Sequence, residues 1–280
     1  MQRLFGKTVS ASPVNGSNDL LSDLTSIREA LEIRGNKSIS YDFIKERRLR
    51  EQLYIDNLRM ENAALNLKDK ELERFYTFCV NAFYQVENIV NYFFHITYPA
   101  IDDLLYILEE STKNDGENGK FGFKRSQKEP KEKNVSDIQI FHKINALCNM
   151  LFPEDTIFKI TLGNLRKVRN EGEHRCQVIY NQKNEKDSLY QFLQKSTFNS
   201  VRMALIKLVS SIKEDIQNPK KEEIVGIIEN KLPSTCFISY SGKTKQIPVK
   251  FFKKVKHLNK GDKLLILLSY NILIDIKEYK

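Results

Sequence analysis

Residues 169–174 (Arg-Asn-Glu-Gly-Glu-His) combine a permanent cation with a titratable imidazole at the end of a helical stretch. An arginine can clamp a phosphate through its planar fork of N–H donors, and a histidine can transfer protons near neutral pH. These groups suffice for metal-free RNA cleavage, in which the ribose 2′-hydroxyl attacks while the protein moves protons and neutralises charge. We therefore take Arg169, Asn170 and His174 as candidate catalytic residues, with Asn170 orienting a side chain or bonding the phosphate.

The same residues also have a structural interpretation. Arg169 can serve as a surface cation that complements a helix C-terminus, and His174 as an exposed polar residue after a helix capped at Gly172. Five residues at the helical period place Arg169 and His174 roughly 140° apart around the axis. A shared site then needs a helix distorted near Gly172, or convergence through the long arginine side chain.

Helical periodicity runs through most of the chain before residue 218, which predicts a mainly α protein up to that point. Residues 71–218 form the predicted helical bundle, and the motif lies on one of its helices. Residues 1–70 form a predicted N-terminal helical arm, whose charged helix is either an exposed arm or a dimerising element. Residues 111–136 are crowded with Lys, Glu, Asn, Gly and Ser, so we expect a mobile loop there.

Arg169 is followed at once by Asn170, and four residues separate it from His174, a pattern similar to the Arg-x4–6-His signature of the HEPN superfamily. The members of this superfamily are small helical bundles. The resemblance covers about residues 71–217. It implies a homodimer in which two motifs meet and cut RNA without metal or cofactor, His174 transferring protons and Arg169 binding phosphate. It further implies a toxin or antiphage effector, with an antitoxin or another defence-complex component as a possible partner. The tyrosine that follows the histidine in one subfamily is replaced by Cys176, so we do not expect that form of regulation.

The hydrophobic period changes after residues 218–221 (Asn-Pro-Lys-Lys), and we predict a second domain at residues 222–280. Short β-rich runs separated by turn signals favour a small closed barrel. These runs cover residues 224–228, 235–240, 246–251, 263–269 and 272–276. Residues 226–228 (Gly-Ile-Ile) and 258–264 (Leu-Asn-Lys-Gly-Asp-Lys-Leu) resemble the layout of cold-shock or OB-type barrels. The family's aromatic stacking strand is absent, since Ser-Thr-Cys-Phe stands at that place.

This predicted barrel is basic and carries aromatic residues, a combination typical of RNA binding. Residues 222–280 contain eleven lysines and six acidic residues, a net charge of +5 out of +9 for the whole chain. Candidate base-stacking residues are Phe237, Tyr240 and Phe251, although alternate positions on a small barrel must fill its core. Candidate phosphate contacts are Lys250, Lys253, Lys254 and Lys256.

The composition indicates which kinds of partner, compartment and cofactor to expect. The pI of about 9.2 favours a polyanionic partner, and the alternative is a lysine-rich chain that binds no polyanion. The four cysteines are widely spaced, which favours buried, reduced thiols in a cytoplasmic protein without a zinc site. We expect no signal peptide, no membrane span and no metal or nucleotide cofactor. Two functions without catalysis stay open: an RNA-binding or regulatory dimer, and a scaffold subunit whose basic tail docks an acidic partner.

Overall fold

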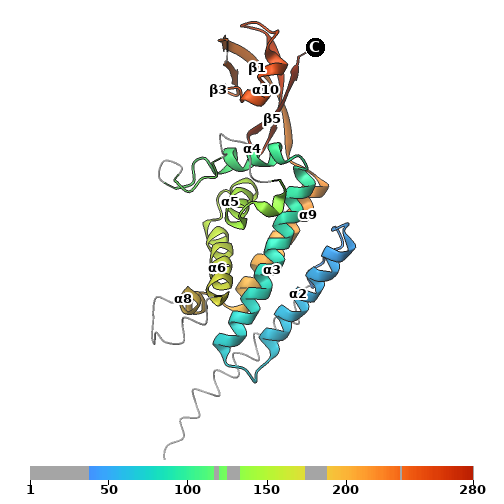
Figure 1. Cartoon of the computed structure of the whole chain (residues 1–280), viewed down its shortest axis with the longest axis vertical. Helices are drawn as coiled ribbons and strands as arrows, with labels where there is room; N and C mark the ends of the chain where they lie inside the picture. Colours follow the sequence, from blue (N-terminus) through green and yellow to red (C-terminus); the bar gives the residue numbers. More distant parts are fainter. Residues whose placement is uncertain (1–37, 117–119, 125–132, 174–187, 234, 280) are drawn as a thin grey trace, which may run out of the picture. The chain divides into compact units, whose positions relative to one another are not determined.

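The computed structural model describes residues 38–116, 120–124, 133–173, 188–233 and 235–279 (Figure 1). By internal contacts the chain divides into two compact units. The first comprises residues up to Gln85 together with Asn164–Ile206, and the second comprises Val86–Gly163 together with Lys207–Lys280. The long helices α3 (Glu71–Thr97), α6 (Thr156–Glu173) and α9 (Phe198–Gln217) contribute residues to both units.

The core of the first unit is built from phenylalanine rings of α3, α8 (Ser188–Lys195) and α9. The rings of Phe75 and Phe78 both meet Phe198 edge-on, with centroids 5.2 and 5.1 Å apart. Phe192 adds a tilted contact to Phe75 at 5.5 Å. Edge-to-face pairs at these separations are favourable beyond the apolar area that they bury. Phe75, Phe78 and Phe83 of α3 are therefore buried, as the sequence predicts for this aromatic helix, whereas Tyr84 is exposed.

Helix α2 (Arg47–Leu65) packs one face into this first unit and leaves the other open. Leu53, Met60 and Ala64 are buried, whereas Ile55 and Leu58 are exposed. Arg74 of α3 donates from Nη2 to the carbonyl oxygen of Ala64 at 2.7 Å, which satisfies a group at the C-terminal end of α2. Within the described residues, α2 thus contributes buried side chains to the core of the first unit.

The helices of the second unit include α4 (Ile101–Thr112) and α5 (Ile140–Leu151), which pack against each other. A short 3-10 helix at Val135–Asp137 precedes α5. The buried Lys143 of α5 donates from Nζ to Asn91 Oδ1 at 2.5 Å and to the carbonyl oxygen of Val135 at 2.8 Å. These bonds tie α5 to α3 and to the chain segment that leads into α5.

Residues 111–136 are described in part, and the described part is anchored by hydrogen bonds. The backbone N–H of Phe123 donates to Thr112 Oγ1 at 2.8 Å, and that of Phe121 donates to the carbonyl oxygen of Asp115 at 3.0 Å. Residues 117–119 and 125–132 lie outside the described residues, so the expectation of a mobile loop stays a prediction.

The second unit also contains a five-stranded antiparallel sheet with the strand order β3-β2-β1-β4-β5. Its strands are β1 (Lys221–Lys231), β2 (Cys236–Tyr240), β3 (Lys243–Gln246), β4 (Lys263–Ser269) and β5 (Ile272–Glu278). Two-residue turns join β2 to β3 and β4 to β5. Ser241 and Gly242 have φ values of 49° and 72°, and Tyr270 and Asn271 have 51° and 62°. Positive φ at both turn residues is the type I′ geometry that suits the twist of a hairpin.

The sheet is open, which corrects the prediction of a closed barrel. In the described residues β3 pairs with β2 alone and β5 with β4 alone, so both are edge strands. The chain leaves β3 after four residues and enters helix α10 (Val249–Val255) at Pro248, where a strand was predicted over residues 246–251. Proline has no N–H to donate to a neighbouring strand, so it is disfavoured inside a sheet. At the start of a helix that N–H would have no partner in the helix, so its absence costs nothing. Helix α10 packs against β5 and buries Phe251 and Val255 (Figure 1).

Candidate functional site

The motif begins in the last turn of α6, a helix whose start is defined by Asp155. Asp155 Oδ1 accepts a hydrogen bond from the backbone N–H of Phe158 at 2.9 Å, a standard N-terminal cap. This bond and the ion pair with Lys207 hold the pKa of Asp155 below its ordinary value, the lysine having the larger effect. Further along α6, Leu165 and Val168 are buried, and this burial fixes which side of the helix carries the motif.

Arg169 and Asn170 are half-buried neighbours on α6. Arg169 Nη1 donates to Asn170 Oδ1 at 3.3 Å. The helix continues through Gly172 to Glu173, so it is neither capped nor interrupted at the glycine. His174 lies outside the described residues, and its distance from Arg169 stays a prediction.

The predicted base-stacking residues differ in exposure. Tyr240 and Phe251 are buried at 6% and 5% exposure, whereas Phe237 on β2 is half-buried. The Phe251 ring meets Tyr106 of α4 edge-on with centroids 6.1 Å apart. A base can stack only on a ring face that solvent can reach. Phe237 is therefore the most open of the three, and stacking stays a prediction for all of them.

The predicted phosphate-binding lysines lie on α10 and just beyond it, and they fall into two groups. Lys250 pairs with Asp103 at 3.1 Å, and Lys254 pairs with Asp275 at 2.5 Å. Lys253 and Lys256 are exposed and make no ion pair within the described part of the chain. Free ammonium groups release counterions most effectively when they meet phosphates. Lys253 and Lys256 are thus the better placed of the four.

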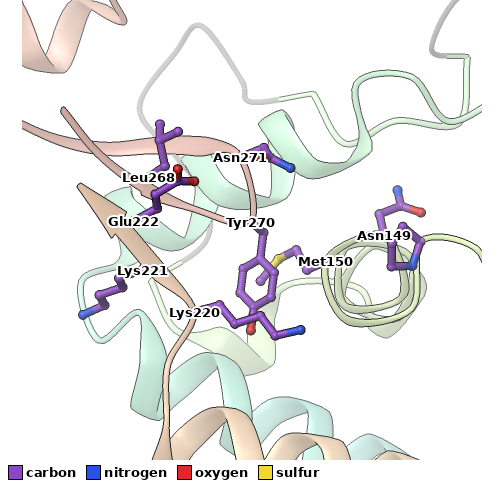
Figure 2. A pocket seen from close by; sticks show the side chains of 9 residues that line it. Asn149, Met150, Lys220, Lys221, Glu222, Leu268, Tyr270 and Asn271 are labelled. Carbon is purple, nitrogen blue, oxygen red and sulfur yellow. The ribbon is translucent and has the colours of Figure 1, made fainter. Parts of the chain in front are cut away.

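Sequence reasoning did not find a pocket of about 470 Å³ beside the turn between β4 and β5. Figure 2 shows Lys220 reaching under the ring of Tyr270, with Asn149 of α5 on the opposite side. The Tyr270 hydroxyl donates to Asp215 of α9. Burial raises the pKa of Tyr270, and the hydrogen bond to the Asp215 carboxylate raises it further. Lys220 and Lys221 line this pocket, but in the sequence they indicated only a domain boundary.

The prediction of buried cysteines is confirmed for those that the structure describes. Cys79, Cys148 and Cys236 are buried and free, and Cys176 lies outside the described residues. Burial raises the pKa of Cys148 to about 12, which suppresses the reactive thiolate. Among the residues that the structure describes, no group of three or more His, Cys, Asp or Glu side chains could hold a metal ion. No described helix is long and apolar enough to cross a bilayer.

Comparison with protein-family models, with curated proteins and with solved structures gives no match to this chain. The similarity to the HEPN superfamily therefore rests on the spacing of Arg169, Asn170 and His174 within a helical protein.

Proposed function

We propose that this chain is a metal-independent endoribonuclease of HEPN type that acts as a homodimer. The observation that carries the proposal is the placement of Arg169 and Asn170, which are adjacent on α6 and in contact through Nη1 and Oδ1, on a helix that buries Leu165 and Val168. His174 follows them in the sequence. A guanidinium held at a helix surface can neutralise the charge that develops on a phosphate, and a neighbouring imidazole can move the protons.

The open sheet supplies the second part of the proposal, which is RNA binding. The OB type is a five-stranded, partly open barrel, and this sheet, left open between β3 and β5, is compatible with an opened relative of it. Exposed Lys253 and Lys256 and half-buried Phe237 support contact with an RNA backbone and base. In this proposal the sheet holds the RNA and the paired motifs cleave it, in a toxin or antiphage role.

The test is cleavage of labelled RNA by the purified protein in the presence of EDTA. We expect products with a 2′,3′-cyclic phosphate and a 5′-hydroxyl, and no reaction when the cut site carries a 2′-deoxyribose, because the nucleophile is then absent. His174→Ala should lower the rate by about 10²–10⁴-fold, the usual contribution of a general acid or base. Arg169→Lys should restore little of the activity lost in Arg169→Ala, since the planar fork of donors is missing.

Four other results would redirect the assignment. RNA binding without cleavage by the wild-type protein would favour a non-catalytic RNA-binding or regulatory dimer, and absence of both would favour a scaffold subunit. A His174→Ala protein that cuts RNA at the wild-type rate would exclude the motif as the active site. Light scattering should give about twice the chain mass of 32.7 kDa, and a strict monomer that still cleaves RNA would exclude a site shared between two copies.

A further inference from the structure

Three adjoining cavities of the second unit form one groove along the β4–β5 hairpin. The cavity of about 470 Å³ shares Asn149 and Asn271 with a second cavity of about 170 Å³. The second shares Lys113 and Lys245 with a third, of about 220 Å³, which Tyr240 also lines. We call this the hairpin groove, and the residues used below are Lys220, Lys221, Asn149, Asn271, Lys245 and Tyr240.

Positive charge lies at both ends of the hairpin groove. Lys220 and Lys221 are exposed at one end and make no ion pair within the described residues, with Glu222 the acidic residue beside them. At the other end Lys245 lies over the Tyr240 ring, 5.8 Å from its centroid. Lys113, between the ends, is paired with Glu110 at 2.6 Å. Four lysines against these two carboxylates leave the lining with a net charge of +2.

A buried donor without a partner marks the Lys245 end. The Tyr240 side chain is 6% exposed, and its hydroxyl makes no hydrogen bond in the described part of the chain. Burial raises the pKa of Tyr240, so this hydroxyl stays protonated and can donate. A buried polar group without a partner costs free energy, and an acceptor supplied by a ligand would remove that cost. Together with the ammonium of Lys245, the hydroxyl provides donors that suit a phosphate oxygen.

Two asparagines line the middle of the groove, and only one of them has its amide engaged in hydrogen bonds. The Asn149 amide is already engaged, since Nδ2 donates to Ser111 and Asp115 at 2.8 and 2.9 Å and Oδ1 accepts from Lys159 at 3.0 Å. Asn271 instead is exposed on the type I′ turn, which the hydrogen bond from Tyr270 to Asp215 holds in place. Figure 2 shows the Asn271 side chain projecting from this turn toward the α5 side of the pocket. An asparagine amide can both donate to and accept from the edge of a base.

We propose that the hairpin groove binds a segment of single-stranded RNA, with Lys220 and Lys221 contacting the backbone at one end, Lys245 and Tyr240 holding a phosphate at the other, and Asn271 bonding a base edge between them. This inference rests on the proposed function in taking RNA as the polyanion. It assigns the RNA a path along the groove, in addition to contacts with the exposed lysines Lys253 and Lys256. The polar lining and the charge at both ends suit an extended charged strand better than an apolar small molecule.

The test compares two double variants of the full-length protein that lose the same charge. Lys220→Gln/Lys221→Gln removes the basic end of the groove, and Lys260→Gln/Lys277→Gln removes two exposed lysines that do not line it. Affinity for a labelled single-stranded RNA oligonucleotide is measured by fluorescence anisotropy at several salt concentrations. Each lost phosphate contact lowers the slope of log K against log salt by about 0.7. We expect the groove variant to lose about 1.4 from the slope and Lys260→Gln/Lys277→Gln to keep the wild-type slope.

Two single variants test the neutral contacts. Tyr240→Phe should weaken binding several-fold without changing the salt slope, because it removes a hydrogen bond and no charge. Asn271→Gly keeps a residue that accepts positive φ and should change the ratio of affinities for oligo(U) and oligo(A). Wild-type affinity and salt slope in Lys220→Gln/Lys221→Gln, with RNA binding by the wild-type protein intact, would overturn the groove while RNA binding stands. Failure of the wild-type protein to bind RNA at low salt would overturn both proposals.

Discussion

Replacement of the buried Lys143 by methionine should change how the stability of the protein depends on pH. Lys143 is 1% exposed, and its ammonium bonds Asn91 and the carbonyl oxygen of Val135. Burial lowers its pKa from 10.5 to about 8, against opposing contributions from the nearby carboxylates of Glu87 and Asp137. Lys143→Met removes the titrating group while keeping an unbranched apolar stem of similar length.

The sign and size of the effect follow from the two pKa values. Between pH 8 and pH 10.5 the unfolded chain holds the Lys143 proton more tightly than the folded chain does, so the free energy of unfolding rises with pH. Each pH unit contributes about 1.4 kcal/mol, so the full difference between 10.5 and about 8 corresponds to about 3 kcal/mol. Below pH 8 both states carry the proton, and the folded state bears the whole penalty.

The assay is urea denaturation of the wild-type protein and of Lys143→Met at pH 7.5 and pH 10. Subtracting the free energy of unfolding of the variant from that of the wild type cancels the contribution of the other titrating groups. From pH 7.5 to pH 10 we expect the free energy of unfolding of the wild type to rise by about 2–3 kcal/mol relative to that of Lys143→Met. Lys260→Met, which removes an exposed lysine, serves as the matched control and should show little of this gain. A difference between wild type and Lys143→Met that stays constant with pH would refute the reasoning.

Two further predictions concern packing and acid stability. Gly226→Ala should destabilise the protein by about 1–3 kcal/mol, because the added Cβ would lie 2.2 Å from Ile266 Cδ1 and 3.1 Å from the backbone oxygen of Ser239. Gly163→Ala on α6, where the Cβ meets nothing within 4 Å, should instead stabilise by about 0.5–1 kcal/mol, and equal melting temperatures for the two variants would contradict this reasoning. His142, whose pKa burial lowers from 6.5, should contribute a loss of stability as pH falls below that value, because the folded state binds the proton less readily. Urea denaturation at pH 7.5 and pH 5 should show a smaller loss for His142→Gln, and an equal loss would exclude this role of the imidazole.

Local patterns in the sequence were enough for the helices and for the hairpin turns. In α9, Val201, Leu205, Leu208 and Ile212 recur at helical spacing and all are buried, because an amphipathic stripe needs only neighbouring residues to define it. Ser241-Gly242 likewise marks a turn by itself, since glycine adopts positive φ without strain. For the same reason the sequence alone singles out Arg169, Asn170 and His174, whose spacing is local.

Features that depend on long-range contacts were decided by tertiary structure. Residues 246–251 alternate like a strand, yet α10 begins directly after Pro248. So short an apolar run fits either structure, and packing against β5 selects the helix. The sheet stays open for a related reason, since closure needs β3 to pair with β5 and no local signal specifies that pairing.

The exposure of candidate side chains and the hairpin groove also required the folded chain. Phe251 was a candidate for base stacking by residue type, but Tyr106, far away in sequence, covers it. The groove brings together Asn149, Lys220 and Asn271, which belong to a helix, the start of a strand and a turn. The sequence thus determined which residues can carry charge and protons, because that is a property of each side chain. Tertiary structure decided which of the described residues meet a ligand, because burial and proximity arise only when distant segments pack.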